Sequence, residues 1–159
     1  MSIMPFALPR RSKSLLRLPV FFLVLFFLAG THRGFAQETT DYTQVIQKCL
    51  DLPGLQSHYA TNADGSKQQV RILQHPFAFP AGITVSKFNS PILFVSRDGV
   101  AGLDAYINFT SFSIENNKAT AGLIMTYGRN SNSPGSVRMT VSLEKVANQW
   151  NIINSTLEN

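Results

Sequence analysis

The first clear pattern of apolar and polar positions along the chain is helical and covers residues 41–50. Its apolar residues recur at spacings of three and four, which places them on one helical face. They are Tyr42, Val45, Ile46, Cys49 and Leu50. Asp41 is a suitable N-cap, with Gln44 three residues later to complete a capping box. Pro53 and the glycine after it end the pattern, so we expect a short helix over 41–50.

From residue 55 onward the pattern favours β-structure. We expect strands over residues 55–60, 69–75, 92–95, 103–115, 118–127, 137–144 and 150–157. Apolar and polar side chains alternate most clearly over 137–144, as in a strand with one buried and one exposed face. The pair Asn116-Asn117 predicts a tight hairpin turn. Within 103–115 the apolar face changes near Thr110-Ser111, which predicts a β-bulge there.

The segment 75–91 breaks this pattern. Its prolines exclude it from a central strand, yet it carries Phe77, Phe79 and Phe88. One interpretation is a lid or binding surface, because apolar side chains on a loop can line a pocket mouth or contact a partner. The other is that these rings fill an open end of the sheet, since a domain of this size needs its large apolar groups for its own core.

One helix followed by several antiparallel strands predicts an α+β fold, with an N-terminal helix packed on a highly curved antiparallel sheet of about six strands. The chain ends with Lys145, Trp150 and Ile152 in the spacing K-x-x-x-x-W-x-I, after an alternating apolar strand. Over residues 103–157 this arrangement resembles the last hairpin of NTF2-like and cystatin-like domains. That resemblance implies a helix packed into the concave face of the sheet. The protease-binding motif of cystatins has its nearest match at 98–102, where the glutamine is missing.

The first 36 residues have the layout of a cleavable signal peptide. A basic region precedes an apolar run over 20–30, and Gly34 and Ala36 supply small residues before a cut at Gln37. The run is too short for a membrane-spanning helix. Five of the 14 basic residues and none of the nine acidic ones precede the cut, so the net charge of +5 becomes zero in residues 37–159. We therefore expect a secreted or periplasmic single domain that binds neither nucleic acid nor, after cleavage, membrane.

Motifs of hydrolases, metal sites and phosphate-binding loops are missing from the sequence, and we expect no cofactor and no metal. The spacing of His58, His75 and Asp104 does not support a metal site. Cys49 falls on the apolar face of the helix, which indicates a buried, unreactive thiol. Resemblance to NTF2-like enzymes would imply acid–base work by side chains inside the sheet's cavity. The candidates are His58, Tyr59, Asp104 and Tyr106.

These observations favour a non-enzymatic binding module, acting on a small apolar ligand or on a protein partner. The candidate ligand-binding residues are Phe77, Phe79, Phe88 and Tyr106. A small NTF2-like enzyme is the alternative. A third possibility is self-association, as a homodimer, through an edge strand. A large pocket with convergent polar groups would favour a ligand or an enzyme, whereas a solid core with exposed apolar residues would favour a protein partner.

Overall fold

The computed structural model describes residues 37–158, so the predicted signal peptide lies outside the described residues. Residues 37–50 are helical, and Val45, Ile46, Cys49 and Leu50 on the predicted face are all fully buried. The helix already includes residues 37–40, so the prediction that Asp41 is its N-cap was wrong. Asp41 lies inside the helix, and its carboxylate is therefore available for contacts with the sheet.

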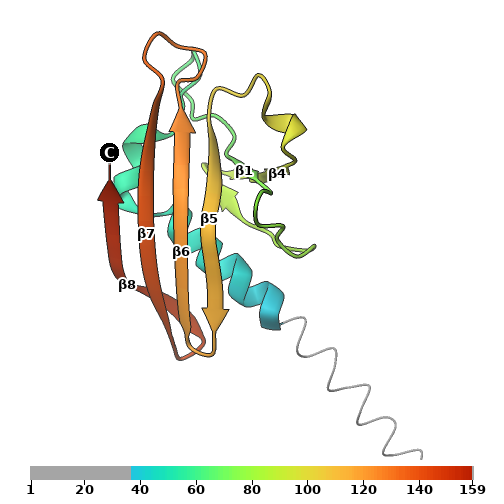
Figure 1. The fold of residues 1–159 in the computed structure, drawn as a ribbon, viewed down its shortest axis with the longest axis vertical. Coiled ribbons are helices and arrows are strands. Elements are labelled where there is room, and N and C mark those ends of the chain that lie inside the picture. The colour runs from blue at the N-terminus through green and yellow to red at the C-terminus, as the bar shows by residue number, and fades with distance from the viewer. Residues whose placement is uncertain (1–36, 159) are drawn as a thin grey trace, which may run out of the picture. The chain divides into compact units, whose positions relative to one another are not determined.

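A six-stranded sheet in the order β4-β1-β5-β6-β7-β8 lies beside this helix (Figure 1). Its strands are β1 (Arg71–Leu73), β4 (Leu93–Val95), β5 (Tyr106–Glu115), β6 (Lys118–Tyr127), β7 (Gly135–Val146) and β8 (Gln149–Glu158). A separate two-stranded ribbon pairs β2 (Ser86–Lys87) with β3 (Ser90–Pro91). Strands β5 to β8 form the antiparallel meander that the sequence predicts.

The sheet departs from the prediction in two respects. It is mixed, because β1 runs parallel to both β4 and β5. The connections permit this, since parallel neighbours need long ones: residues 74–92 join β1 to β4, and residues 74–105 separate β1 from β5. The sheet is also not strongly curled (Figure 1). The predicted bulge is present, as a register shift between Phe109 and Ser111 in the pairing of β5 with β6.

The strand predicted over 55–60 was wrong, because Pro53–His58 forms the 3-10 helix η1. Pro53 suits the first turn of a helix, where its missing N–H costs no hydrogen bond. Gly54 lets η1 approach the end of β8 closely, because a Cβ there would lie 2.6 Å from Cδ1 of Leu157. The remaining strands lie where the pattern placed them, and β6 has the predicted bounds.

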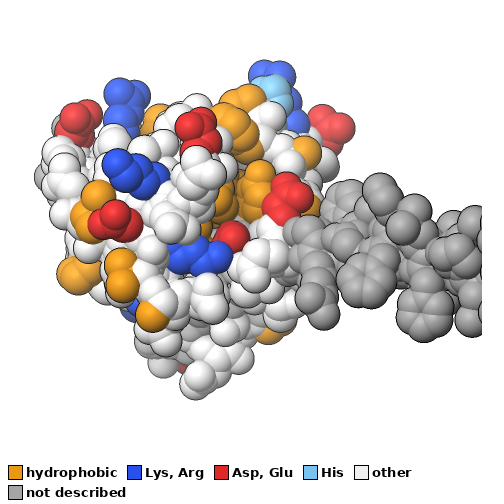
Figure 2. Space-filling model, turned by 90° about the horizontal axis from the view of Figure 1, so that it is seen from below, with side chains coloured by type: hydrophobic (Ala, Val, Ile, Leu, Met, Phe, Trp, Pro, Cys, Tyr) orange, Lys and Arg blue, Asp and Glu red, His pale blue; other side chains and the backbone are white. Residues whose placement is uncertain are grey.

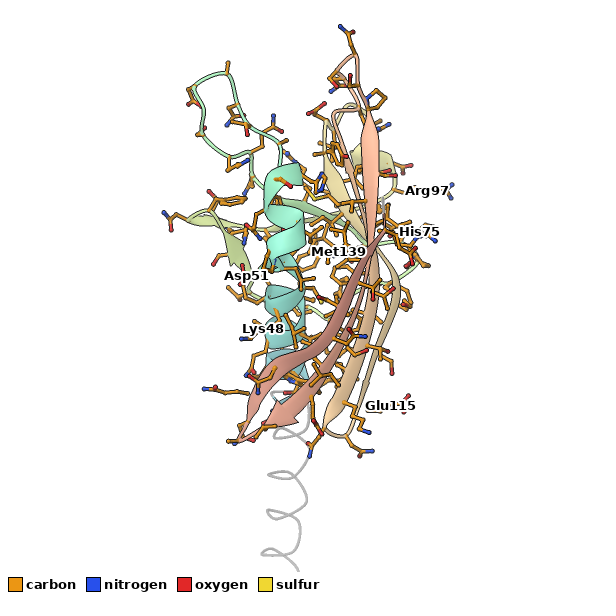
Figure 3. The ribbon with its side chains drawn as sticks, turned by 90° about the vertical axis from the view of Figure 1, so that its left-hand side faces the viewer. Lys48, Asp51, His75, Arg97, Glu115 and Met139 are labelled. Carbon is orange, nitrogen blue, oxygen red and sulfur yellow. The ribbon has the colours of Figure 1, made fainter. Side chains whose placement is uncertain are left out.

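The core lies between the helix and one face of the sheet, where Met139 of β7 is sandwiched (Figure 3). Phe79, from the long loop, also belongs to this core. Its ring contacts those of Tyr42, Phe94, Phe109 and Phe112, with centroids 5.3 to 6.3 Å apart. In the part of the chain that the structure describes, no helix is both long and apolar enough to cross a membrane.

Candidate protein interface

The four candidate ligand-binding residues lie in different surroundings. Phe79 is 8% exposed within the aromatic cluster, and Phe77 packs half-buried against the core. Phe88, at the turn between β2 and β3, is 36% exposed, and its ring centre lies 5.1 Å from that of Tyr59 in a T-shaped arrangement. Tyr106 lies under the guanidinium of Arg129, 5.6 Å from its ring centre. That these residues bind a ligand stays a prediction.

A recess lined in part by Tyr59 and Tyr106 has a volume of about 10 Å³, which is room for one water molecule. Its walls come from the segment 59–71 and from the neighbouring ends of β5 and β6. A small apolar ligand needs a cavity of several hundred Å³. Two hollows in the described chain reach that size, one of about 310 Å³ and one of about 270 Å³. Only a few side chains wall each of them, and both walls include charged groups: Glu38 and Asp41 in the larger hollow, Arg138 and Glu158 in the smaller. The interior between helix and sheet is filled by the protein's own side chains.

The acid–base candidates each make a local structural contact. The Tyr59 hydroxyl donates to the carbonyl of Leu50 at 2.8 Å, and burial raises the pKa of this phenol. Asp104 accepts from the backbone N–H of Asn130 at 2.9 Å. The ring of His58 lies 4.9 Å from that of Tyr127. Among residues 37–158, no three His, Cys, Asp or Glu side chains are grouped so that they could hold a metal ion.

The edge strand β8 differs from the recess and from the acid–base candidates, because it exposes both backbone hydrogen-bonding groups and apolar side chains. It is ten residues long and ends the sheet (Figure 1). Only Trp150 is fully buried in it, and Leu157 is half-buried. Ile152 and Ile153 are 38% and 61% exposed, and Val146 at the end of β7 is 58% exposed. Three of the five exposed large hydrophobic residues in the described chain therefore lie on the β7–β8 hairpin.

From the end of the molecule that Figure 2 shows, hydrophobic atoms form small groups separated by polar and charged side chains. A surface of this kind offers individual apolar anchors rather than a continuous hydrophobic face. Any affinity at the β8 edge would then come from backbone pairing together with these anchors.

The first half of β8 is tied to the helix by a polar network around Asp41. Its Oδ1 accepts from Nζ of Lys145 at 2.6 Å and from Nε1 of Trp150 at 3.0 Å. The carboxylate also accepts from Nε2 of Gln37 at 3.3 Å. Burial alone would raise the pKa of Asp41, but the hydrogen bonds from Lys145, Trp150 and Gln37 outweigh it, so the pKa is lowered. The network explains the K-x-x-x-x-W spacing, since both side chains must reach one carboxylate.

A second contact from the helix covers the edge itself at this end. The backbone N–H of Trp150 donates to Oε1 of Gln44 at 3.4 Å. This N–H therefore points away from β7, and the side chain of Gln44 occupies the position that an incoming strand would take. Pairing with another chain is thus blocked at the start of β8.

A bulge divides β8 in the middle. Ile152 lies opposite Leu143 and Asn154 opposite Ser142, so Ile153 is an extra residue with no partner on β7. Because a bulge breaks the regular ladder, an added strand cannot pair continuously along the whole of β8. The sequence signalled this point, since the consecutive Ile152-Ile153 interrupts the alternation, but our reading of the pattern missed it.

Beyond the bulge, the stretch 154–158 keeps its edge open. Trp150 lies opposite Lys145 and turns its N–H away from β7. The orientation alternates along an antiparallel ladder, so at every second residue of β7, counted from Lys145, the partner on β8 also turns its backbone groups away from β7. Ser155, opposite Val141, and Leu157, opposite Met139, therefore turn their backbone groups away from β7. The stretch contains no proline and no lysine, the residues that commonly protect an edge.

The opposite edge of the sheet is better protected. Its strand, β4, has only three residues and follows Pro91 closely. The 3-10 helix η2 (Asp98–Val100) comes directly after it. Short length and a nearby proline are both common means of blunting an edge, so β8 is the better candidate for an interface.

No protein-family model, no curated protein and no solved structure matches this chain.

Proposed function

We propose that this chain is an exported, non-enzymatic binding domain, and that the open stretch 154–158 of β8 receives an extended segment of a protein partner. The observation that carries the proposal is an edge with outward backbone groups at Ser155 and Leu157, next to the exposed side chain of Ile153. Added strands gain affinity from main-chain hydrogen bonds and specificity from side-chain contacts at alternate positions. The closed core favours this reading over a small apolar ligand in the sheet's interior.

Export and a relationship to NTF2-like or cystatin-like domains belong to the same proposal. The layout of residues 1–36 supports export. A helix on one face of the sheet and a final hairpin that carries Lys145 and Trp150 support the relationship. The parallel pairing of β1 with its neighbours is a departure from a purely antiparallel sheet.

Random twelve-residue peptides displayed on phage provide a probe that presumes no partner. We expect selected peptides to bind the exported protein and to slow backbone hydrogen exchange at residues 154–158. The substitution Ser155→Pro removes an N–H that does not pair with β7, so the fold is retained and peptide binding falls at least tenfold. The matched control is Thr156→Ala, which lies in the same stretch and keeps its backbone groups.

The proposal is wrong if the selected peptides protect another surface, or if Ser155→Pro binds them as well as the unmodified protein does. Far-ultraviolet circular dichroism and the unfolding midpoint of each variant show whether the fold has been retained. Should Ser155→Pro disturb the fold, Leu157→N-methyl-leucine, introduced by semisynthesis, removes the corresponding N–H without restricting the backbone as proline does.

A further inference from the structure

The open stretch of β8 has one property that the proposed function does not require, which is that it is complementary to itself. A two-fold axis perpendicular to the sheet can pair this stretch with the same stretch of a second copy. Each residue must then lie opposite a residue of the other copy whose side chain is on the same face of the sheet. With the axis at Thr156, Ser155 meets Leu157 of the other copy and Asn154 meets Glu158. The side chains of Ser155 and Leu157 are on the core face, because these residues lie opposite the core residues Val141 and Met139. The side chains of Asn154 and Glu158 are on the other face, so both pairs match.

The backbone groups match in this register as well. Ser155 and Leu157 turn their N–H and C=O groups outward, so each of the two Ser155–Leu157 pairs can exchange two hydrogen bonds. Thr156 pairs inward with Thr140, which makes the meeting of the two Thr156 residues a non-hydrogen-bonded pair. Such a pair has its Cα atoms about 4.5 Å apart. Cross-strand threonine pairs of this kind are favourable.

The charges also suit a second copy. Glu158 is the one charged residue of β8. In this register it meets the amide of Asn154 from the other copy rather than the second Glu158, and an amide N–H can donate to a carboxylate. On its other side Glu158 lies opposite Arg138 of β7, so the two like charges are separated and each is next to a cation of its own copy. Shifting the axis to residue 158 would instead place the two glutamates directly opposite each other.

We infer that the partner segment at the β8 edge is β8 of a second copy of this chain, paired antiparallel over residues 154–158 about a two-fold axis at Thr156. This inference rests on the proposed function. The bulge at Ile153 and the side chain of Gln44 limit the pairing to these five residues. The interface is therefore small, and the dimer should form reversibly as concentration rises, as transient complexes of small area do.

Disulfide trapping tests the register. In the exported protein, Thr156→Cys places two thiols on the axis at a Cα separation of about 4.5 Å, which lies within the range of a disulfide. Asn151→Cys is the matched control, since Asn151 is also exposed and on β8 but five residues from the axis. Its two copies would be roughly 30 Å apart at about 3.3 Å per residue. The native Cys49 is buried and does not interfere.

Under mild oxidation we expect Thr156→Cys to form disulfide-linked dimers at least ten times faster than Asn151→Cys. Equal rates would overturn the inference. Sedimentation of the protein without added cysteines is the second measurement. Thr156→Lys should abolish its concentration-dependent dimer, because two ammonium groups would meet on the axis, whereas Thr140→Lys on the neighbouring strand should not. A dimer that survives Thr156→Lys would also overturn it.

The two proposals fail in different ways. If Thr156→Cys is not trapped faster than its control and the protein stays monomeric, but phage-selected peptides still protect residues 154–158, the second copy is excluded and the edge site stands. If neither a second copy nor any peptide pairs with this stretch, both proposals are refuted.

Discussion

Asp41 offers the sharpest test of the structural argument, because one carboxylate oxygen joins the helix to both strands of the last hairpin. The side chains of Asp41 and Lys145 are 13% and 11% exposed, and Trp150 is fully buried. Replacing Asp41 with alanine leaves an ammonium and an indole N–H without this acceptor. Breaking a buried ion pair on one side costs about 3–5 kcal/mol, and an unsatisfied buried donor costs about 1–3 kcal/mol.

Water can reach part of the network, so we expect the lower end, a loss of about 3 kcal/mol in the free energy of unfolding for Asp41→Ala. Trp150 is the only tryptophan in the chain and reports on this contact directly. Urea unfolding followed by its fluorescence gives the measurement. Glu38→Ala, an exposed position one turn earlier in the helix, is the control and should change stability by less than about 0.5 kcal/mol. A loss below about 1 kcal/mol for Asp41→Ala would refute the reasoning.

The same network makes stability depend on pH in a defined direction. The pKa of Asp41 is lowered in the folded protein from its ordinary value of 3.8, so the unfolded chain binds this proton more readily. The resulting stabilisation is complete above about pH 5 and is lost as the pH falls from there through the folded pKa. Asp41→Asn should therefore lose less stability than the unmodified protein between pH 5 and pH 2. Asp64, whose pKa is also lowered, contributes equally to both proteins.

Backbone conformation, burial and the predicted cleavage site also set measurable properties at other positions. Gly135→Ala should destabilise the protein by about 1–3 kcal/mol, since its Cβ would lie 2.6 Å from the ring of Tyr127, and an unchanged urea midpoint would contradict this. Ala147→Asn should stabilise it by roughly 0.5–1 kcal/mol, because alanine at φ 49° is strained and asparagine adopts this region more easily; a lower midpoint would argue against it. Burial raises the pKa of Cys49 to about 12, so a thiol reagent at pH 8 should label it only in urea, and labelling of the native protein would show the thiol to be accessible. We expect cleavage after Ala36, so the intact mass of the protein produced in a secretory host should correspond to a chain that begins at Gln37, and a mass that includes Met1 would contradict the predicted signal peptide.

Local patterns predicted the parts of the fold that depend on near neighbours. The spacing of Val45, Ile46 and Cys49 identified the buried face of the helix, because that face follows from helical geometry alone. The change of phase near Thr110 identified the bulge in β5, because the alternation of faces along a strand is also a local property. The turn at Asn116 and the strands beside it also depend on a few adjacent residues, and these too lie as expected.

Contacts between distant residues were beyond the pattern. Asp41 lies 104 residues from Lys145 and 109 from Trp150, so its role could not be read from its neighbours, and it was interpreted as a helix cap. The parallel pairing of β1 depends on where the long loop returns the chain, which local sequence does not specify. For the candidate interface, the sequence suggested an edge strand but not which residues of that edge stay open. That answer came from Gln44, whose side chain reaches β8 only in the folded protein.

The aromatic loop links these observations to function. Phe79 enters the core and contacts four other rings, so at least this part of segment 75–91 serves the protein's own packing, as one of the two readings of the sequence expected. A domain of this size has few large apolar groups to spare, and those used to close the core cannot also line a ligand cavity. The proposed recognition of a protein partner uses the surface instead. On that surface the backbone of Ser155 and Leu157 supplies directional hydrogen-bonding groups, and Ile153 supplies an apolar anchor beside them. The domain thus combines a core filled by its own side chains with an edge whose outward backbone groups do not pair with β7.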